Sequence, residues 1–159
     1  MIMNQFKRRF YRSPRQFWRE FKFLIKNRAQ IRAVMRQDLI QPAFRERLMM
    51  AVTAVNGCRY CSYFHAREAL LAGISEAEVE ALLSGVVDHC PEAEIPAVLY
   101  AQHWAESDAR PDASARQKLV EVYGSKIASA IELALRMIRM GNLLGNTWDY
   151  FLYRLSMGR

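Results

Sequence analysis

The sequence predicts an all-α fold: a compact helical bundle with an amphipathic helix at its N-terminus. Hydrophobic residues make up 52% of the 159 residues, and no long segment alternates apolar with polar side chains as a half-buried strand does. Apolar residues instead recur at helical spacing, and the connections between these stretches are short. A chain of this length folds as one domain with a sizeable core, to which a short segment can be appended.

Charge divides the chain into a basic arm, residues 1–37, and a helical domain, residues 38–159. The arm contains eleven Lys or Arg and one Glu, a balance of +10, whereas the domain contains twelve Lys or Arg and fifteen Asp or Glu, a balance of −3. The net charge of +7 therefore comes from the arm alone.

The arm is predicted to be one helix over residues 13–37, since Ser13 and Pro14 suit the N-cap and the first helical position. Apolar side chains form a stripe on this helix: Phe17, Phe21, Leu24, Ile31 and Met35. The stripe packs against the domain or another subunit, or else the helix lies on an anionic membrane or contacts nucleic acid. Because aromatic side chains suit a membrane surface better than a groove, no nucleic-acid partner is expected.

Six further helical segments are predicted in the domain. Pro42 opens the first, which ends at Asn56 and Gly57, immediately before a cysteine. A glycine closes the next one, and Ser75 with Glu78 forms a capping box for the third. The segments cover residues 42–55, 58–72, 75–85, 92–107, 112–123 and 124–155, the last with a break at Gly141 to Gly145.

Two of the three cysteines stand three residues apart at the start of a helix, followed by a histidine four residues later. Cys58, Cys61 and His65 lie at about 0°, 300° and 340° around the helix axis, so all three face one way. The free N–H groups and the positive dipole end of a helix stabilise a thiolate. A neighbouring imidazole can accept a thiol proton, and a second thiol can close a disulfide. The pattern favours redox chemistry.

Two other interpretations of this cluster stay open at the level of residue types. Buried cysteines behave as small hydrophobic residues, and a single histidine is often part of a core. A structural zinc site needs four ligands, but the further candidates, Cys90, His89 and His103, lack a second paired spacing. No metal and no cofactor is expected, and Cys90 is most simply an isolated structural thiol.

The segment "ERLMMAVTAVNGCRYCSYFH", from Glu46 to His65, resembles the signature of the alkylhydroperoxidase D-like, carboxymuconolactone decarboxylase-type proteins. That signature places a glutamate twelve residues before Cys-X-X-Cys and a histidine four residues after it. The later "GNTWDYF" agrees with the same family, and the resemblance extends over roughly residues 38–155.

The resemblance implies a thiol-dependent peroxidase or disulfide oxidoreductase that reduces hydroperoxides. Carried over by position, Cys61 attacks the peroxide, Cys58 resolves the product as a disulfide, and His65 with Glu46 forms a proton relay. The residues alone leave the two sulfurs undecided, because Cys58 is nearer the helix N-terminus and Cys61 is nearer His65. Without the resemblance, the favoured interpretation of Glu46 is a solvated residue that pairs with neighbouring Arg45 or Arg47.

One position departs from the family pattern. Some relatives carry a relay histidine immediately before the second cysteine, where this chain has Tyr60, a poor base near neutral pH. A shorter relay and a lower peroxidase efficiency are therefore expected. The decarboxylase branch generally lacks the cysteine pair, so lactone decarboxylation is disfavoured.

The resemblance also implies a lipoylated or thioredoxin-like thiol electron donor and a homo-oligomer, a trimer or hexamer. The low cysteine count, the absence of a cleavable leader and the short apolar runs favour a cytoplasmic protein. The alternative to an enzyme is a non-catalytic helical scaffold, or a protein that binds a membrane or a partner through residues 1–37, with regulatory cysteines.

Overall fold

The computed structural model describes residue 6, residues 8–36 and residues 39–156, and all regular secondary structure in these residues is helical. This confirms the all-α prediction. The helices are α1 (Pro14–Lys26), α2 (Arg28–Met35), α3 (Pro42–Asn56), α4 (Arg59–Leu71), α5 (Glu76–Leu83), α6 (Ile95–Glu106) and α7 (Ala113–Ser156).

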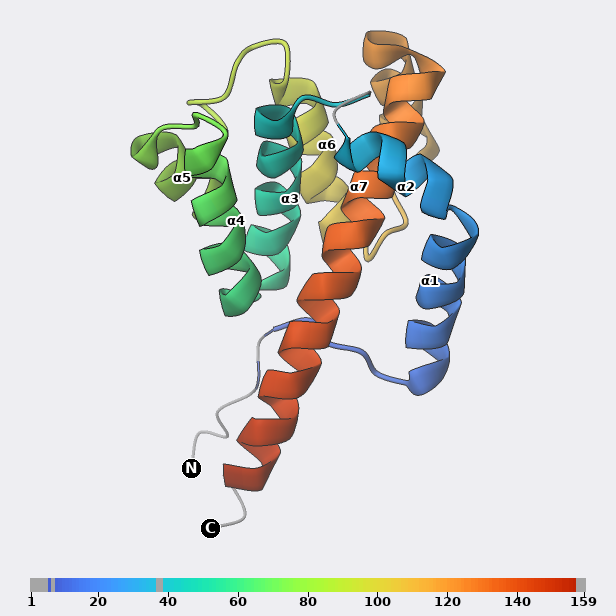
Figure 1. The fold of residues 1–159 in the computed structure, drawn as a ribbon, viewed down its shortest axis with the longest axis vertical. Coiled ribbons are helices and arrows are strands. Elements are labelled where there is room, and N and C mark those ends of the chain that lie inside the picture. The colour runs from blue at the N-terminus through green and yellow to red at the C-terminus, as the bar shows by residue number, and fades with distance from the viewer. Residues whose placement is uncertain (1–5, 7, 37–38, 157–159) are drawn as a thin grey trace.

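The long helix α7 separates two layers of the molecule. Figure 1 shows α1 and α2 on one side of α7, and α3, α4, α5 and α6 on the other. Helix α3 is central, because it contacts α4, α5, α6 and α7. The C-terminal end of α7 projects beyond the bundle (Figure 1).

The core is built where α3, α6 and α7 meet. Its largest fully buried side chains include Leu48 and Met50 of α3, Trp104 of α6, and Ile131 and Leu135 of α7. Burial of each such side chain contributes roughly 1.5–3 kcal/mol to the free energy of folding. This core fixes the positions of α3 and α7, and the cysteine pair lies at the start of α4 with Cys58 against α7.

The arm contains two helices and not the single predicted one. Helix α1 ends at Lys26, because the Asn27 side chain donates a hydrogen bond to the carbonyl of Phe23 and the Asn27 backbone leaves the helical region. The predicted apolar stripe packs on the domain through Leu24 and Ile31, but Met35 at its end is exposed and Val34 is buried in its place. Residues 1–5, 7 and 37 of the predicted arm lie outside the described residues.

The predicted break at Gly141 to Gly145 is wrong, because α7 is helical through both glycines. The departure from helical geometry lies instead at Gly124, with φ of 76° and ψ of 159°, where the chain changes direction. Only glycine adopts this conformation without strain. The kink coincides with the predicted junction between residues 112–123 and 124–155.

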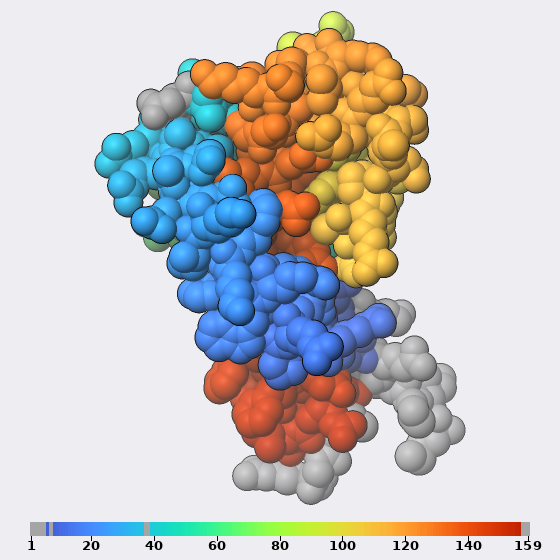
Figure 2. All heavy atoms as spheres, turned by 90° about the vertical axis from the view of Figure 1, so that its right-hand side faces the viewer, coloured from blue at the N-terminus to red at the C-terminus, as the bar shows by residue number. Residues whose placement is uncertain are grey.

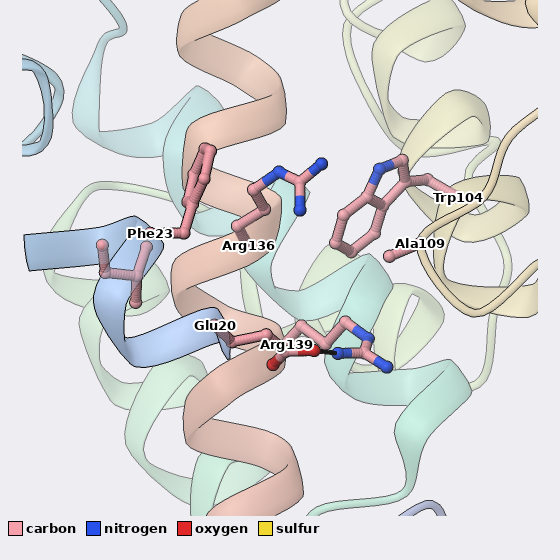
Figure 3. A pocket seen from close by; sticks show the side chains of 7 residues that line it. Glu20, Phe23, Trp104, Ala109, Arg136 and Arg139 are labelled. Atoms are coloured by element: carbon pink, nitrogen blue, oxygen red, sulfur yellow. Dashed lines mark hydrogen bonds and ion pairs between the residues drawn. The ribbon is translucent and has the colours of Figure 1, made fainter. Parts of the chain in front are cut away.

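Buried polar contacts attach the arm to α7. The Arg139 guanidinium, which is 4% exposed, pairs with Glu20 of α1 and, at 2.5 Å, with Asp108 of the loop after α6. Tyr11 donates a hydrogen bond to the other Glu20 oxygen at 2.6 Å. Figure 3 shows Glu20 and Arg139 joined, with Arg136 one turn away between the rings of Phe23 and Trp104.

No helix within residues 8–36 and 39–156 is both long enough and apolar enough to span a membrane.

Substitution of Arg139 with alanine is expected to lower the free energy of unfolding by about 3 kcal/mol, since it leaves Glu20 without its cationic partner in a half-buried position. Arg136→Ala is the matched control, because this exposed guanidinium contacts only aromatic rings and its loss costs less than about 1 kcal/mol. Urea denaturation measures both. Equal losses in the two variants would contradict the role assigned to the Arg139 pair.

Candidate functional site

The turn between α3 and α4 places both cysteines at the start of α4. Gly57 has φ of 70°, in the left-handed region that ends a helix, so the chain reverses directly after Asn56. Cys58 is then the N-cap of α4, and its sulfur accepts a hydrogen bond from the backbone N–H of Cys61 at 3.4 Å. A sulfur thus takes the place of the usual cap oxygen at the positive end of the helix dipole.

The two thiols lie against each other and differ in exposure. Both cysteines are free, with their sulfurs 2.8 Å apart, so the pair needs little movement to form a disulfide. Cys58 is fully buried, whereas Cys61 is half-buried. Cys61 is therefore the sulfur that a molecule from solution reaches first.

The pair shares its protons unequally. The Cys61 thiol donates a hydrogen bond to the Cys58 thiolate, which lowers the pKa of Cys58 to about 6, and backbone N–H groups assist against the opposing effect of burial. The pKa of Cys61 is raised, first because its proton holds that bond and then because of burial. One thiolate per pair therefore exists near neutral pH, and in the resting site it is centred on Cys58.

A carboxylate and an imidazole meet across α3 and α4. Glu46 Oε2 lies 2.7 Å from His65 Nδ1, and Glu46 is only 3% exposed. The other carboxylate oxygen accepts a hydrogen bond from Arg45 Nε at 3.2 Å. The alternative of a solvated Glu46 is excluded by its burial, although the expected arginine contact is present. When the Nδ1–H group of His65 donates a hydrogen bond to Glu46, Nε2 of the neutral ring carries no hydrogen and can accept a proton from another group.

The structure brings the four candidate residues together as two pairs. Within the described part of the chain, no hydrogen bond joins the His65 ring to either sulfur. His65 follows Cys61 by four residues on α4, so the two side chains are neighbours on one face of the helix.

Tyr60 turns away from this relay and toward α7. Its hydroxyl donates a hydrogen bond to Asp149 at 3.0 Å, and the Arg59 guanidinium contacts the same carboxylate at 2.9 Å. Arg8 pairs with the second oxygen of Asp149, which is 6% exposed. Tyr60 therefore connects the start of α4 to α7, and its contacts with the described residues do not replace those of a relay histidine.

The sequence analysis missed two asparagines on α7, both fully buried. Asn142 hydrogen-bonds Cys61, which opposes the rise in the pKa of that thiol, and its amide also bonds Thr53 and Asn56 of α3, each at 3.1 Å. Asn146 donates to the backbone carbonyl of Asn56 at 2.8 Å. The signal was available as "GNLLGN", in which buried amides recur four residues apart in an apolar helix.

Cys90 lies apart from the pair, beside a buried ion pair. Arg47 Nε contacts Glu78 at 2.5 Å, and the pKa of Cys90 is raised to about 11, mainly by burial and then by Glu78. Its thiol is therefore protonated at neutral pH. The predicted zinc alternative finds no donor set, since the described residues hold no group of three or more His, Cys, Asp or Glu arranged for a metal.

Gly145 provides room for the Cys58 sulfur, because a Cβ at this position would lie 3.0 Å from it. Gly145→Ala is expected to lower the free energy of unfolding of the reduced protein by about 1 kcal/mol, since overpacking outweighs the gain in helix propensity. Gly141→Ala, with no atom within 4 Å, should instead raise it by up to about 1 kcal/mol. Urea denaturation under reducing conditions measures both, and a stabilised Gly145→Ala would show that the sulfur is not confined.

Comparison with known proteins shows that residues 23–107 match the model of the carboxymuconolactone decarboxylase family. Neither the curated proteins nor the solved structures that were searched contain a match. The matched range is shorter at its C-terminal end than the resemblance expected from the sequence, and it includes Glu46, both cysteines of the pair and His65 but not α7. Because this match covers more than half of the chain, the chain belongs to the carboxymuconolactone decarboxylase family.

Proposed function

We propose that this protein is a thiol-dependent peroxidase or disulfide oxidoreductase that reduces hydroperoxides through the Cys58–Cys61 pair. The observation that carries the proposal is a dithiol at a helix N-terminus, with Cys61 half-buried and Cys58 fully buried beside it. The family includes both alkylhydroperoxidase D-like peroxidases and decarboxylases, and the dithiol favours the first. A decarboxylase gains nothing from a pair of sulfurs 2.8 Å apart.

The first chemical step is assigned to Cys61, the sulfur that solvent reaches. Its proton passes to Cys58 or to His65, and the resulting thiolate attacks the terminal oxygen of the hydroperoxide. The O–O bond breaks, Cys61 becomes a sulfenic acid, and the departing alkoxide takes a proton to leave as an alcohol. Glu46 orients the His65 ring so that Nε2 can accept the proton from Cys61 and later give it to the alkoxide.

The second step closes the disulfide. The Cys58 thiolate attacks the Cys61 sulfur, and the sulfenic oxygen leaves as water after accepting a proton. Any proton that Cys58 received in the first step passes to the departing alkoxide, and the backbone N–H groups at the start of α4 stabilise the thiolate that this step needs. A thiol or dithiol donor, of lipoyl or thioredoxin-like type, then reduces the disulfide by two electrons and returns the pair to its starting state.

A homo-oligomer, a trimer or hexamer, also remains a proposal. Exposed apolar side chains on two neighbouring helices support it: Tyr63, Phe64 and Leu71 on α4, and Trp148, Phe151 and Leu155 on α7. Apolar side chains in such number are typical of a surface that is covered by another protein.

The central test counts free thiols after the reduced protein meets a hydroperoxide. We expect the wild-type protein to lose two of its three thiols and Cys61→Ser to lose none rapidly. Cys58→Ser should instead accumulate a sulfenic acid on Cys61, which a dimedone adduct located by mass spectrometry identifies. Cys90→Ser is the matched control and should behave as the wild type with one thiol fewer.

Unchanged thiols in the wild-type protein would remove the peroxidase proposal and leave the non-catalytic scaffold as the better reading. A dimedone adduct on Cys58 in Cys61→Ser would keep the chemistry and exchange the two roles.

The relay is tested by Glu46→Gln, which keeps the size of the side chain but removes its charge. An amide can donate to Nδ1 and so place the proton on Nε2, the wrong nitrogen for proton transfer. We expect kcat/KM for the hydroperoxide to fall about 10- to 100-fold. Glu80→Gln, an exposed carboxylate on α5, is the control and should change the rate less than about twofold. A full rate in a folded Glu46→Gln protein would remove Glu46 from the mechanism.

A further inference from the structure

A dense group of positive charges, here called the basic face, covers the outward side of α1 and α2 and includes one residue before α1 and one after α2. Its members are all exposed: Arg12, Arg15, Arg19, Lys22, Lys26, Arg28, Arg32 and Arg36. Figure 2 shows α1 and α2 in blue as the outer layer on this side of the molecule. In the described chain, none of these eight side chains forms an ion pair or a hydrogen bond.

The basic face is unneutralised because the one carboxylate on its helices points inward. Glu20 contacts Arg139 and Tyr11 on the side of α1 that packs against the domain. The mutual repulsion of eight neighbouring cations is therefore not relieved within the described chain, and an anionic surface would relieve it.

Exposed apolar side chains lie among these cations. Trp18 is 54% exposed and Ile25 is 49% exposed, and their separation of seven residues places them two turns apart on one side of α1. Lys22 lies between them on the same side. Met35 at the end of α2 is exposed as well. Trp18 and Ile25 are additional to the predicted stripe, which packs on the domain through Leu24 and Ile31 but leaves Met35 exposed.

A recess at the edge of the basic face brings two more guanidinium groups, those of Arg110 and Arg136, close to Arg15 and Arg19. A cavity of about 490 Å³ is lined by Arg15, Arg19, Arg110 and Arg136, and by Arg139, which Glu20 and Asp108 already neutralise. The first four have no carboxylate partner in the described chain. The recess therefore suits phosphate groups that project from an anionic surface.

We propose that the basic face docks the protein on the surface of an anionic lipid bilayer, with α1 and α2 parallel to the membrane plane. Lysines and arginines contact lipid phosphates, while Trp18 and Ile25 enter the boundary between headgroups and acyl chains. A bilayer is favoured over nucleic acid because Ile25 and Met35 cannot stack on bases or bond their edges, whereas both partition into an apolar boundary. The proposal does not depend on the peroxidase chemistry.

The test uses the full-length protein and vesicles made either of phosphatidylcholine alone or of an equal mixture with phosphatidylglycerol. Sedimentation should show binding to the anionic vesicles only, weakening at high salt. The triple variant Arg15→Glu/Lys22→Glu/Lys26→Glu should bind at least about tenfold more weakly. The control Arg67→Glu/Lys118→Glu/Arg154→Glu changes the net charge equally at exposed positions outside the basic face and should keep the wild-type affinity. Circular dichroism melting checks that both variants fold.

Insertion is read separately from tryptophan fluorescence with brominated lipids. Quenching should persist in Trp148→Phe and fall sharply in Trp18→Phe, since Trp104 is buried and Trp148 belongs to α7 and not to the basic face. The proposal is overturned if the protein does not bind anionic vesicles, or if both triple variants lose affinity equally. It is also overturned if the basic face binds RNA or duplex DNA while the protein binds anionic vesicles no more tightly than neutral ones.

Discussion

Buried amides joining α7 to the end of α3 set the geometry on which the rest of this site depends. Asn142 bonds Thr53 and Asn56, and Asn146 bonds the carbonyl of Asn56, one turn before α4 begins. A buried amide without partners costs about 1–3 kcal/mol, so α7 cannot slide or rotate against α3 without a large penalty. This register brings Gly145 against Cys58 and Asp149 against Tyr60.

From that register the chemistry of the pair follows. The turn at Gly57 begins α4 with a sulfur, the N–H of Cys61 points at it, and the second thiol lies beside it. Because α3 is held against α4, Glu46 also reaches His65 with a buried carboxylate. Two helices and one tight turn therefore supply the dithiol and the imidazole, while α7, outside the matched family range, closes the site from behind.

Much of this could be predicted from local signals in the sequence. Asn56-Gly57 marked the end of α3, and the spacing of Cys58, Cys61 and His65 placed them on one helical face, because both depend on backbone geometry within a few residues. The contact of Glu46 with His65 came only through the family resemblance, since nothing local specifies how two helices pack. Gly141 and Gly145 were interpreted as a helix break, because the actual role of Gly145, room for the sulfur of Cys58, depends on a contact that is distant in the sequence. The end of α1 at Asn27 was missed for a different reason. The amphipathic pattern continues through this position, but the Asn27 side chain donates a hydrogen bond to the carbonyl of Phe23 and the helix ends there.

The use of Cys58 as a helix cap connects oxidation to the integrity of a helix. A thiolate is a strong acceptor for the N–H of Cys61, whereas a sulfur joined in a disulfide is a weak one. Oxidation therefore exchanges a hydrogen-bonded cap for a covalent bond across the same turn, which leaves the N–H of Cys61 without its strong acceptor. A partner that docks on this turn would thereby meet a free N–H donor in the spent protein and a capped one in the fresh protein.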